Sequence, residues 1–453
     1  MKLPSVLRSV RYRKLLTRIR QLEQFRQQSP EEIRTYQWTR VQEIVDYAYR
    51  YVPFYRQLYH QVGYLPGDLK SWDDFRNLPT IHREMFMATP EADLLTELFH
   101  EQEYATEDAT SGTTGKPFLF YKDKRLVERE FLLYNYQKLL LGWVPGEREL
   151  FVKGRIEQEG KEDHLIFRED NQTFRLNGFR ISREVIRQLA GFIRRQKIQL
   201  IYGYPTPIRQ LCHFAREEGV EIRVKLIITM GEVLTDSMRQ QMEDCFGASV
   251  YQLYGAAEAM HMAHECPRRN GLHVDAERYL LEIRRRRQPY TGSGSLLITD
   301  MMNRVMPLIR YEIGDHVQFA DQPCDCGDRT PLIRSISGKR AEIFRTPSGK
   351  ELNLHILLDD IFADLNQELA SFRLIVQNKR QMELLLVPAQ KNDSSLWKQA
   401  VARLQEYLGE DVHIQFKLVD RLEPTPAGKN RSIVVRSAST KKSNKRSKTK
   451  RRK

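Results

Sequence analysis

The chain has 453 residues, 41% of them hydrophobic, which is enough for about two or three domains with a substantial core. Its net charge of +14 comes from its two ends: residues 1–20 carry seven Lys or Arg, residues 437–453 carry nine, and neither segment has an acidic residue. Residues 21–436 therefore carry a net charge of −2, which excludes a large basic groove for nucleic acid.

Hydropathy and cysteine content narrow the class of protein further. No run of about 18 uncharged apolar residues is present, so the sequence predicts no transmembrane segment. The basic N-terminus lacks the apolar block of a signal peptide. Five cysteines are too few for a disulfide framework and suit a reducing compartment. We therefore expect a cytoplasmic protein, with peripheral contact to a membrane as the alternative.

The N-terminal part has helical periodicity. Residues 5–50 place apolar side chains at helical spacing among many charges, which predicts a basic helical segment over residues 1–50. Such a segment either packs on the body of the protein or lies on a membrane surface. Residues 51–81 are rich in aromatic and turn residues and predict a helical lead-in followed by loops.

An alternation of apolar runs and helical patterns follows. Residues 198–203, 224–231 and 248–255 predict strands, and the two segments between them predict helices. This alternation predicts an α/β fold with a mostly parallel sheet flanked by helices, in which ligands bind at the carboxyl ends of the strands. The turns "TMGEVLT" and "LYGAAEAM" follow two of these strands, so we expect them to line one crevice.

The last part of the chain changes in composition. Residues 279–303 predict two antiparallel strands joined by a Gly/Ser turn. Residues 373–422 predict two strands, an amphipathic helix and a third strand, which together make a compact α+β unit. We therefore divide the chain into a basic N-terminal segment (1–50), a large domain (51–338), a small C-terminal domain (339–436) and a basic tail (437–453).

The tail is of low complexity and repels itself, so we expect it to be disordered. It either aids solubility or contacts an anionic surface weakly, such as a membrane, RNA or an acidic polymer.

The polar stretch "ATSGTTGKPF", residues 109–118, carries the first candidate chemistry. Gly frees the backbone, hydroxyls and amides donate hydrogen bonds and Lys adds positive charge, so the stretch suits a phosphate. It is not a Walker A loop, because only two residues separate Gly112 from Gly115 and Pro117 follows Lys116. Taken alone, the stretch is equally compatible with a polar surface loop.

Five further motifs follow in order along the chain. They are "GEVLT" (231–235), "YGAAEAM" (254–260), "RYEIGD" (310–315), "ISGKRAEIF" (336–344) and "PTPAGKNR" (424–431). With residues 109–118, their order and content resemble the adenylate-forming enzymes, which activate a carboxylate with ATP and usually pass the acyl group to a thiol. Residues 40–436 resemble the phenylacetate–coenzyme A ligase family and its capsule-biosynthesis relatives. The resemblance implies a large adenylate-forming domain and a small, mobile α+β lid.

The resemblance also implies roles in catalysis. A carboxylate that attacks the α-phosphate of ATP meets like-charge repulsion, so the reaction needs cations and precise placement. Glu258 is implied to hold Mg²⁺, for which a carboxylate is a suitable ligand. Lys429 is implied to reach both the substrate carboxylate and the α-phosphate. The residues implied to wrap the β- and γ-phosphates are Ser111, Gly112, Thr113, Thr114, Gly115 and Lys116.

Further motif positions are implied to contact the nucleoside. Gly231 and Glu232 match the turn that passes along the adenine, and Tyr254, followed by Gly255, matches the residue against the base. Asp315 matches the acid that accepts both ribose hydroxyls.

Each of these assignments has a structural alternative. Asp315 could cap a turn after Gly314, Tyr254 and Glu258 could belong to the core edge and the solvent, and Lys429 could be a surface residue.

The sequence departs from the family pattern at the expected hinge. Gly338-Lys339 stands in place of Gly-Arg, and Ala341, with Glu342 beside it, stands in place of the acidic hinge residue. Lys339 is a point charge rather than a planar fork, so we expect a weaker nucleotide contact from this position. The motifs therefore support the first half-reaction, adenylate formation, more strongly than the second, acyl transfer.

A second constellation comes from "ECPRRNGLH" and "PCDCGDR". Cys266, His273, Cys324 and Cys326 offer four soft ligands for a tetrahedral zinc ion, with no open position, so the zinc would be structural. Some members of the resembled branch carry such a zinc. The alternatives are a group of reduced thiols, or a ligand set in which His264 or His261 replaces one member.

Three functions follow from these motifs. The first is an ATP-dependent acid–thiol ligase that forms AMP and pyrophosphate, with coenzyme A as the co-substrate. The second passes the acyl group to a sugar amine or hydroxyl in surface polysaccharide biosynthesis. The third is a non-catalytic nucleotide-binding scaffold. The acid is not identified; four aromatic residues after residue 118 either flank an aryl or fatty acid or pack in the core, namely Phe131, Tyr134, Tyr136 and Trp143.

Overall fold

A computed structural model describes residues 10–98, 105–110, 118–153, 165–286, 288–339, 343–347, 351–362, 369–388, 394–422 and 432–435. The predicted phosphate loop and Lys429 lie outside the described residues, and so do Ala341, Glu342 and the basic tail. Among the helices that the structure describes, none is both long enough and apolar enough to cross a bilayer.

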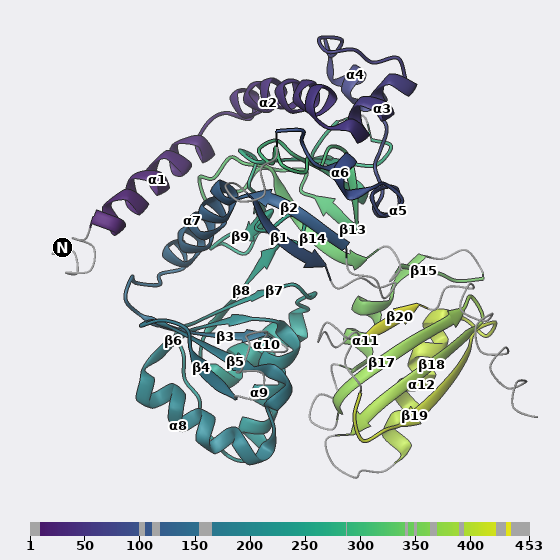
Figure 1. The fold of residues 1–453 in the computed structure, drawn as a ribbon. Helices are drawn as coiled ribbons and strands as arrows, with labels where there is room; N and C mark the ends of the chain where they lie inside the picture. The colour runs from purple at the N-terminus through teal and green to yellow at the C-terminus, as the bar shows by residue number, and fades with distance from the viewer. Residues whose placement is uncertain are drawn as a thin grey trace, which may run out of the picture.

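Two long helices run along one side of the molecule (purple in Figure 1). They are α1 (Val10–Arg26) and α2 (Pro30–Tyr51). Ser29 begins α2 because its side chain accepts the backbone N–H of Glu32, whose carboxylate returns a bond to the backbone N–H of Ser29. The buried face of α2, which includes Val41 and Ile44, belongs to the same core as the antiparallel strands described below. The helix therefore packs on the body of the protein.

Four short helices follow, as the aromatic- and turn-rich composition of residues 51–81 predicts in part. They are α3 (Pro53–Gln61), α4 (Trp72–Asn77), α5 (Arg83–Met87) and α6 (Glu91–Leu94). A two-stranded hairpin comes next, β1 (Ala105–Thr110) with β2 (Phe118–Asp123), and leads into α7 (Lys124–Leu140).

A sheet of twelve strands forms the centre of the large domain, in the order β11-β12-β13-β14-β10-β9-β8-β7-β6-β3-β5-β4. Its strands are β3 (Arg148–Lys153), β4 (Ile166–Arg168), β5 (Thr173–Asn177), β6 (Ile198–Gly203), β7 (Leu226–Met230), β8 (Ser249–Tyr254), β9 (Ala263–Glu265), β10 (Leu272–Val274), β11 (Tyr279–Ile283), β12 (Ser293–Asp300), β13 (Tyr311–Phe319) and β14 (Leu332–Lys339).

The sheet has a parallel part and an antiparallel part. Strands β5, β3, β6, β7 and β8 are parallel, as the strand–helix alternation predicts. The pairs from β8 through β9, β10, β14, β13 and β12 to β11 are antiparallel, and so is β4 with β5. Antiparallel pairing therefore extends well beyond the 279–303 hairpin that the composition indicates.

Helices cover both faces of the parallel part. Three α-helices, α8 (Ile186–Gln196), α9 (Pro205–Glu217) and α10 (Asp236–Phe246), share one core with Ile201 and Ile227, and two short 3₁₀ turns, η2 (Gly178–Arg180) and η3 (Arg183–Val185), precede α8. Leu200 and Leu226, one residue away on the same strands, point to the opposite face and share a core with side chains of α7. Burial on both faces explains why these strands are continuous apolar runs rather than alternating ones.

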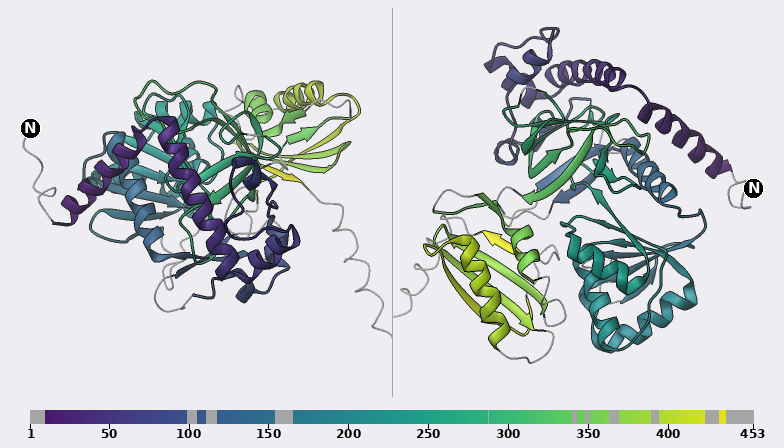
Figure 2. Two further views of the ribbon diagram at one scale, coloured as in Figure 1. Left: turned by 90° about the horizontal axis from the view of Figure 1, so that it is seen from above. Right: turned by 180° about the vertical axis from the view of Figure 1, so that it is seen from behind.

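The small domain has its own sheet and its own core (yellow-green in Figures 1 and 2). Its sheet has the order β19-β18-β17-β20, from β17 (Leu369–Asn378), β18 (Gln381–Pro388), β19 (His413–Leu418) and β20 (Ile433–Val435). Helices α11 (Leu354–Phe362) and α12 (Ser394–Leu408) complete it, with a hairpin of β15 (Ile343–Arg345) and β16 (Glu351–Asn353). The fully buried Trp397 of α12 lies in this core. The α+β character predicted for this part of the chain is confirmed.

Candidate functional site

The turns after β7 and β8 leave the sheet at the same edge, because the two strands are neighbours and parallel. Gly231, the first residue after β7, has φ +74°, and a Cβ at this position would lie 2.8 Å from Cε1 of Tyr204. Both the left-handed backbone and the close ring require glycine here.

Glu232, the next residue, has a structural contact of its own. Its Oε2 accepts the backbone N–H of Thr206 at 3.0 Å, in the first turn of α9. That helix has no side-chain cap at its own N-cap residue, Tyr204. The carboxylate therefore accepts a backbone N–H that has no partner within the helix. Its negative charge also interacts favourably with the positive end of the helix dipole. This contact joins the turn after β7 to the N-terminus of α9, the helix that follows β6.

Tyr254 and Asp315 meet although they lie far apart in the sheet. Three strands separate β8 from β13, and four strand spacings of about 4.8 Å would separate these strands by roughly 19 Å in a flat sheet. The Oη of Tyr254 nevertheless donates to Oδ2 of Asp315 at 2.8 Å. The sheet must therefore fold over between its parallel and antiparallel parts, which brings the two sets of motifs together.

The tyrosine stays protonated in this pair. Burial, reinforced by the charge of Asp315, raises the pKa of Tyr254 well above its usual value. Asp315 lies within β13, with its Cα opposite that of Lys339 on β14, rather than capping a turn. A carboxylate has two oxygens and about four lone-pair sites, so it can accept hydrogen bonds from more than one hydroxyl group.

Glu258 lies in the turn after β8, close enough to the Tyr254–Asp315 pair for its charge to affect Tyr254. Burial first and the charge of Glu258 next raise the pKa of Tyr311 on β13, and Glu258 also contributes to the raised pKa of Tyr254. The turn is tight, because a Cβ at Gly255 would lie 2.8 Å from the backbone nitrogen of His261. The structure therefore brings together four predicted site residues from two distant motifs: Tyr254, Gly255, Glu258 and Asp315.

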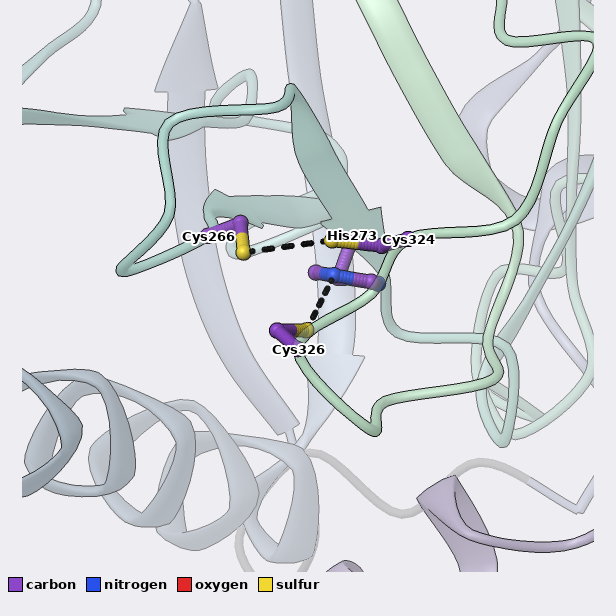
Figure 3. Close-up of side chains that lie close together, drawn as sticks. All are labelled: Cys266, His273, Cys324 and Cys326. Atoms are coloured by element: carbon purple, nitrogen blue, oxygen red, sulfur yellow. Dashed lines mark hydrogen bonds between the residues drawn. The ribbon is translucent and has the colours of Figure 1, made fainter.

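The predicted metal ligands also converge (Figure 3). The ligand atoms of Cys266, His273, Cys324 and Cys326 all lie within 4.8 Å of one another. The Sγ atoms of Cys266 and Cys324 are 3.5 Å apart, and Sγ of Cys326 lies 3.2 Å from Nε2 of His273. Four ligands at about 2.3 Å from a tetrahedral ion would be about 3.8 Å apart, so the donor set fits zinc.

Further residues orient the histidine of this cluster. Nδ1 of His273 lies 3.4 Å from Oγ1 of Thr330 and 3.5 Å from Oδ1 of Asp328. Nε of the buried Arg26, on α1, donates to Oδ2 of Asp328 at 2.6 Å. Partners of this kind hold the ring of a metal-binding histidine with its other nitrogen toward the ion.

The sequence reasoning missed these supporting residues. Asp328 lies two positions after Cys326 in "CDCGDR", which was a usable signal. Arg26 lies 302 positions before Asp328, so no local pattern could have identified it. The two alternative ligands stay outside the cluster: Nε2 of His264 faces Arg26 at 3.4 Å, and the ring of His261 lies beside Tyr134.

Two of the four aromatic residues after residue 118 are buried in the core, and the other two are less buried. Tyr136 and Trp143 are buried in two core clusters. Phe131 is 51% exposed. Tyr134 is half-buried; its Oη donates to Oε2 of Glu149 at 3.0 Å, and its ring packs against Tyr202 with centroids 4.5 Å apart.

Lys122, on strand β2, belongs to a buried network of charged side chains that the sequence did not indicate. Nζ of Lys122 on β2 contacts Glu130 of α7 at 3.1 Å, and Arg278 contacts Glu130 at 3.1 Å and Asp300 at 2.8 Å. All four side chains are at most 10% exposed. The network joins the strand that follows residues 111–117 to the antiparallel part of the sheet.

Comparisons with known proteins agree with this geometry. The family model described as the CapK C-terminal domain matches residues 344–436. The chain is 21% identical to Protein CapK of Staphylococcus aureus, over 72% of this chain and 73% of that protein. It is 26% identical to a phenylacetate-coenzyme A ligase of Thermus thermophilus, over 68% and 71% of the two chains.

Solved structures give the same result for the fold. The structure of 2-hydroxyisobutyryl-CoA ligase in the postadenylation state, in complex with R3-HIB-AMP, superposes with a TM-score of 0.71 at 19% identity, covering 88% of this chain and 89% of that one. The same ligase in complex with 2-HIB-AMP and CoA in the thioesterification state gives a TM-score of 0.58 at 20% identity, covering 90% of each chain. The chain thus has the fold of the adenylate-forming CoA ligases, and its sequence is similar to those of the phenylacetate–coenzyme A ligases and CapK, as the motifs predict.

Proposed function

We propose that the protein is an adenylate-forming ligase that activates a carboxylic acid with ATP and releases pyrophosphate. The observation that carries this proposal is the Tyr254–Asp315 pair, with Glu258 in the adjoining turn, at the carboxyl end of β8 in a fold shared with such ligases. A carboxylate beside a tyrosine hydroxyl at this edge can hold the two ribose hydroxyls of ATP.

The remaining site residues take the roles that the resemblance implies. The backbone and side chains of Ser111, Gly112, Thr113, Thr114, Gly115 and Lys116 bind the β- and γ-phosphates. Glu258 holds Mg²⁺, which when bound neutralises phosphate charge. Gly231 and Glu232 form the turn along the adenine, Gly255 supports Tyr254, and Lys339, whose Cα is paired with that of Asp315, contributes to nucleotide binding.

Coenzyme A is the proposed acceptor of the acyl group, which leaves AMP as the second product. The support is that several similar curated proteins are phenylacetate-coenzyme A ligases. A sugar amine or hydroxyl of a surface polysaccharide is the second candidate, favoured by the match of residues 344–436 to the CapK C-terminal domain. Acceptor-dependent AMP release, compared between coenzyme A and amine acceptors, separates the two.

Acid-dependent exchange of pyrophosphate into ATP tests the activation step. We expect exchange with at least one member of a broad panel of acids. Asp315→Ala should raise the KM for ATP by about 10- to 100-fold, because hydrogen bonds to a charged group are worth about 1.5–3 kcal/mol. Asp315→Asn, which keeps one acceptor oxygen, should lose less. Absence of exchange with every acid, in protein that binds ATP, would favour the non-catalytic scaffold.

The Cys266–His273–Cys324–Cys326 cluster is proposed to bind one structural zinc ion. Metal analysis of protein purified without chelator should find about one zinc per chain, and Cys326→Ser should lose most of it, because the change removes one of the thiolate ligands whose binding holds the ion. Cys245→Ser is the matched control, since Cys245 lies on α10, outside the cluster. No zinc in the unaltered protein, or equal loss from both variants, would contradict the site.

A cytoplasmic location, with weak contact to anionic surfaces through the basic ends of the chain, is also proposed. It is supported by the seven and nine basic residues of residues 1–20 and 437–453.

A further inference from the structure

His261 has features that neither its fold position nor the metal cluster explains. It lies in the turn between β8 and β9, three residues after Glu258, and its φ of +53° places a residue other than glycine in the left-handed region. Its side chain is only 8% exposed. Within the part of the chain that the structure describes, its Nδ1 is buried and has no hydrogen-bond partner. Strained backbone and unpaired buried polar atoms both concentrate at binding sites.

Within the described part of the chain, the neighbours of His261 do not supply the missing bond. The ring of Tyr134 is close, at 6.2 Å between centroids, but its hydroxyl already donates to Glu149. Arg278 and Lys122 are near enough to affect the imidazole, but both are cations that contact carboxylates of the buried network. The partner of Nδ1 is therefore either a ligand or a resident water molecule, and the test below separates the two.

The imidazole stays neutral in this position. Burial, followed by the charges of Arg278 and Lys122, lowers the pKa of His261 to about 3. A neutral imidazole has one donor nitrogen and one acceptor nitrogen. It carries no positive charge that would favour an anionic group as its partner. A hydroxyl group can either donate or accept, and it therefore pairs with Nδ1 in either tautomer.

The position of the ring separates it from the proposed nucleoside contacts. Asp315 reaches Tyr254 from β13, in the antiparallel part of the sheet. The His261 ring instead lies beside Tyr134 of α7, whose ring packs on Tyr202 at the end of β6. Both sites adjoin the turn that carries Glu258, so an acyl-adenylate in this turn would extend its nucleoside to one side and its acyl part to the other.

We propose that His261 contacts the acyl part of the substrate through Nδ1, that its partner is a hydroxyl group, and that the protein therefore acts on a hydroxylated carboxylic acid. This inference rests on the proposed activation of an acid by ATP.

Pairs of acids that differ by one hydroxyl test this directly. Each hydroxy acid is compared with the acid of the same skeleton that lacks the hydroxyl, such as 4-hydroxyphenylacetate with phenylacetate or 3-hydroxybutyrate with butyrate. The readout is the ratio of kcat/KM values in pyrophosphate exchange. For at least one pair, the protein should prefer the hydroxy acid by about tenfold or more, because the other acid leaves the buried nitrogen unpaired.

Two variants at residue 261 give the control. His261→Gly suits the left-handed backbone and removes the ring, so the preference should fall to about one. His261→Asn also tolerates this backbone and keeps polar atoms, so it should retain part of the preference. The KM for ATP should stay unchanged in both. A histidine that only packs in the core, or that binds a resident water, would change thermal stability without moving the ratio, and that result would overturn the proposal.

Failure of the proposed function has a different signature. If no acid supports exchange, the activation step is absent, and the same acid pairs are then compared by calorimetric binding to the unaltered protein and to His261→Gly. Tighter binding of the hydroxy acid, lost in His261→Gly, would support the role of His261 independently of catalysis. Equal binding of both members of every pair would contradict it.

Discussion

Replacement of Lys429 by alanine is expected to slow adenylate formation by at least about 10²-fold, the order observed when one well-placed charge or donor is lost. Lys429 follows a glycine, in a segment with Pro424 and Pro426 before it. Such a segment suits a charge that a moving lid delivers. A cation that acts only in the transition state changes the rate more than the affinity, so the KM for ATP should change little.

The two half-reactions should respond differently to this variant. Transfer from a supplied acyl-adenylate to the acceptor should be nearly normal, because we propose that the small domain rotates and carries Lys429 away for that step. Undiminished adenylation, or an equal loss in both half-reactions, would show that Lys429 is not the activating cation.

Replacement of Arg278 by methionine is expected to lower the free energy of unfolding by about 3–5 kcal/mol, as for other buried ion pairs that lose one partner. The guanidinium is 1% exposed and donates to Oδ2 of Asp300 from Nε at 3.0 Å and from Nη2 at 2.8 Å. Burial disfavours its charge, but Asp300, Tyr279 and Glu130 together outweigh this and raise the pKa of Arg278. Without the arginine, the described partners left to the buried Asp300 would be the backbone N–H groups of Met302 and Asn303.

Denaturant unfolding measures this effect. Arg40→Met is the matched control, because Arg40 pairs with Glu43 while both are 43% exposed, and exposed pairs contribute at most about 1 kcal/mol. Combining Arg278→Met with Asp300→Asn should recover part of the loss, since the second change removes the uncompensated charge. Equal stability of the Arg278 and Arg40 variants would contradict the importance of the network.

The local pattern of apolar and polar residues was sufficient to predict three neighbouring strands of the parallel part of the sheet and the helices between them. Apolar runs at residues 198–203, 224–231 and 248–255 correspond to β6, β7 and β8, and the helical patterns between them correspond to α9 and α10. The same is true of the small domain, where the spacing of apolar side chains predicts β17, β18, α12 and β19. Spacing within one element depends on nearby residues, so it can be seen in the sequence.

The candidate site could be anticipated only in pieces. The motifs containing Tyr254 and Asp315 were each visible, but their hydrogen bond depends on how the sheet folds over between β8 and β13. The unpaired nitrogen of His261 and the support of Asp328 by Arg26 had no counterpart in any motif. These features depend on burial and on partners that are distant along the chain.

The sequence by itself determined the elements, the turns that need glycine and the chemical types of the candidate ligands, because backbone preference, periodicity and side-chain chemistry are local properties. Only the tertiary structure decided which side chains meet. Residues 26 and 328, or 254 and 315, come within hydrogen-bond distance because separate elements bury their apolar faces against one another. That packing, which also removes water from Arg278 and His261, determines which polar groups are paired and which are left for a ligand.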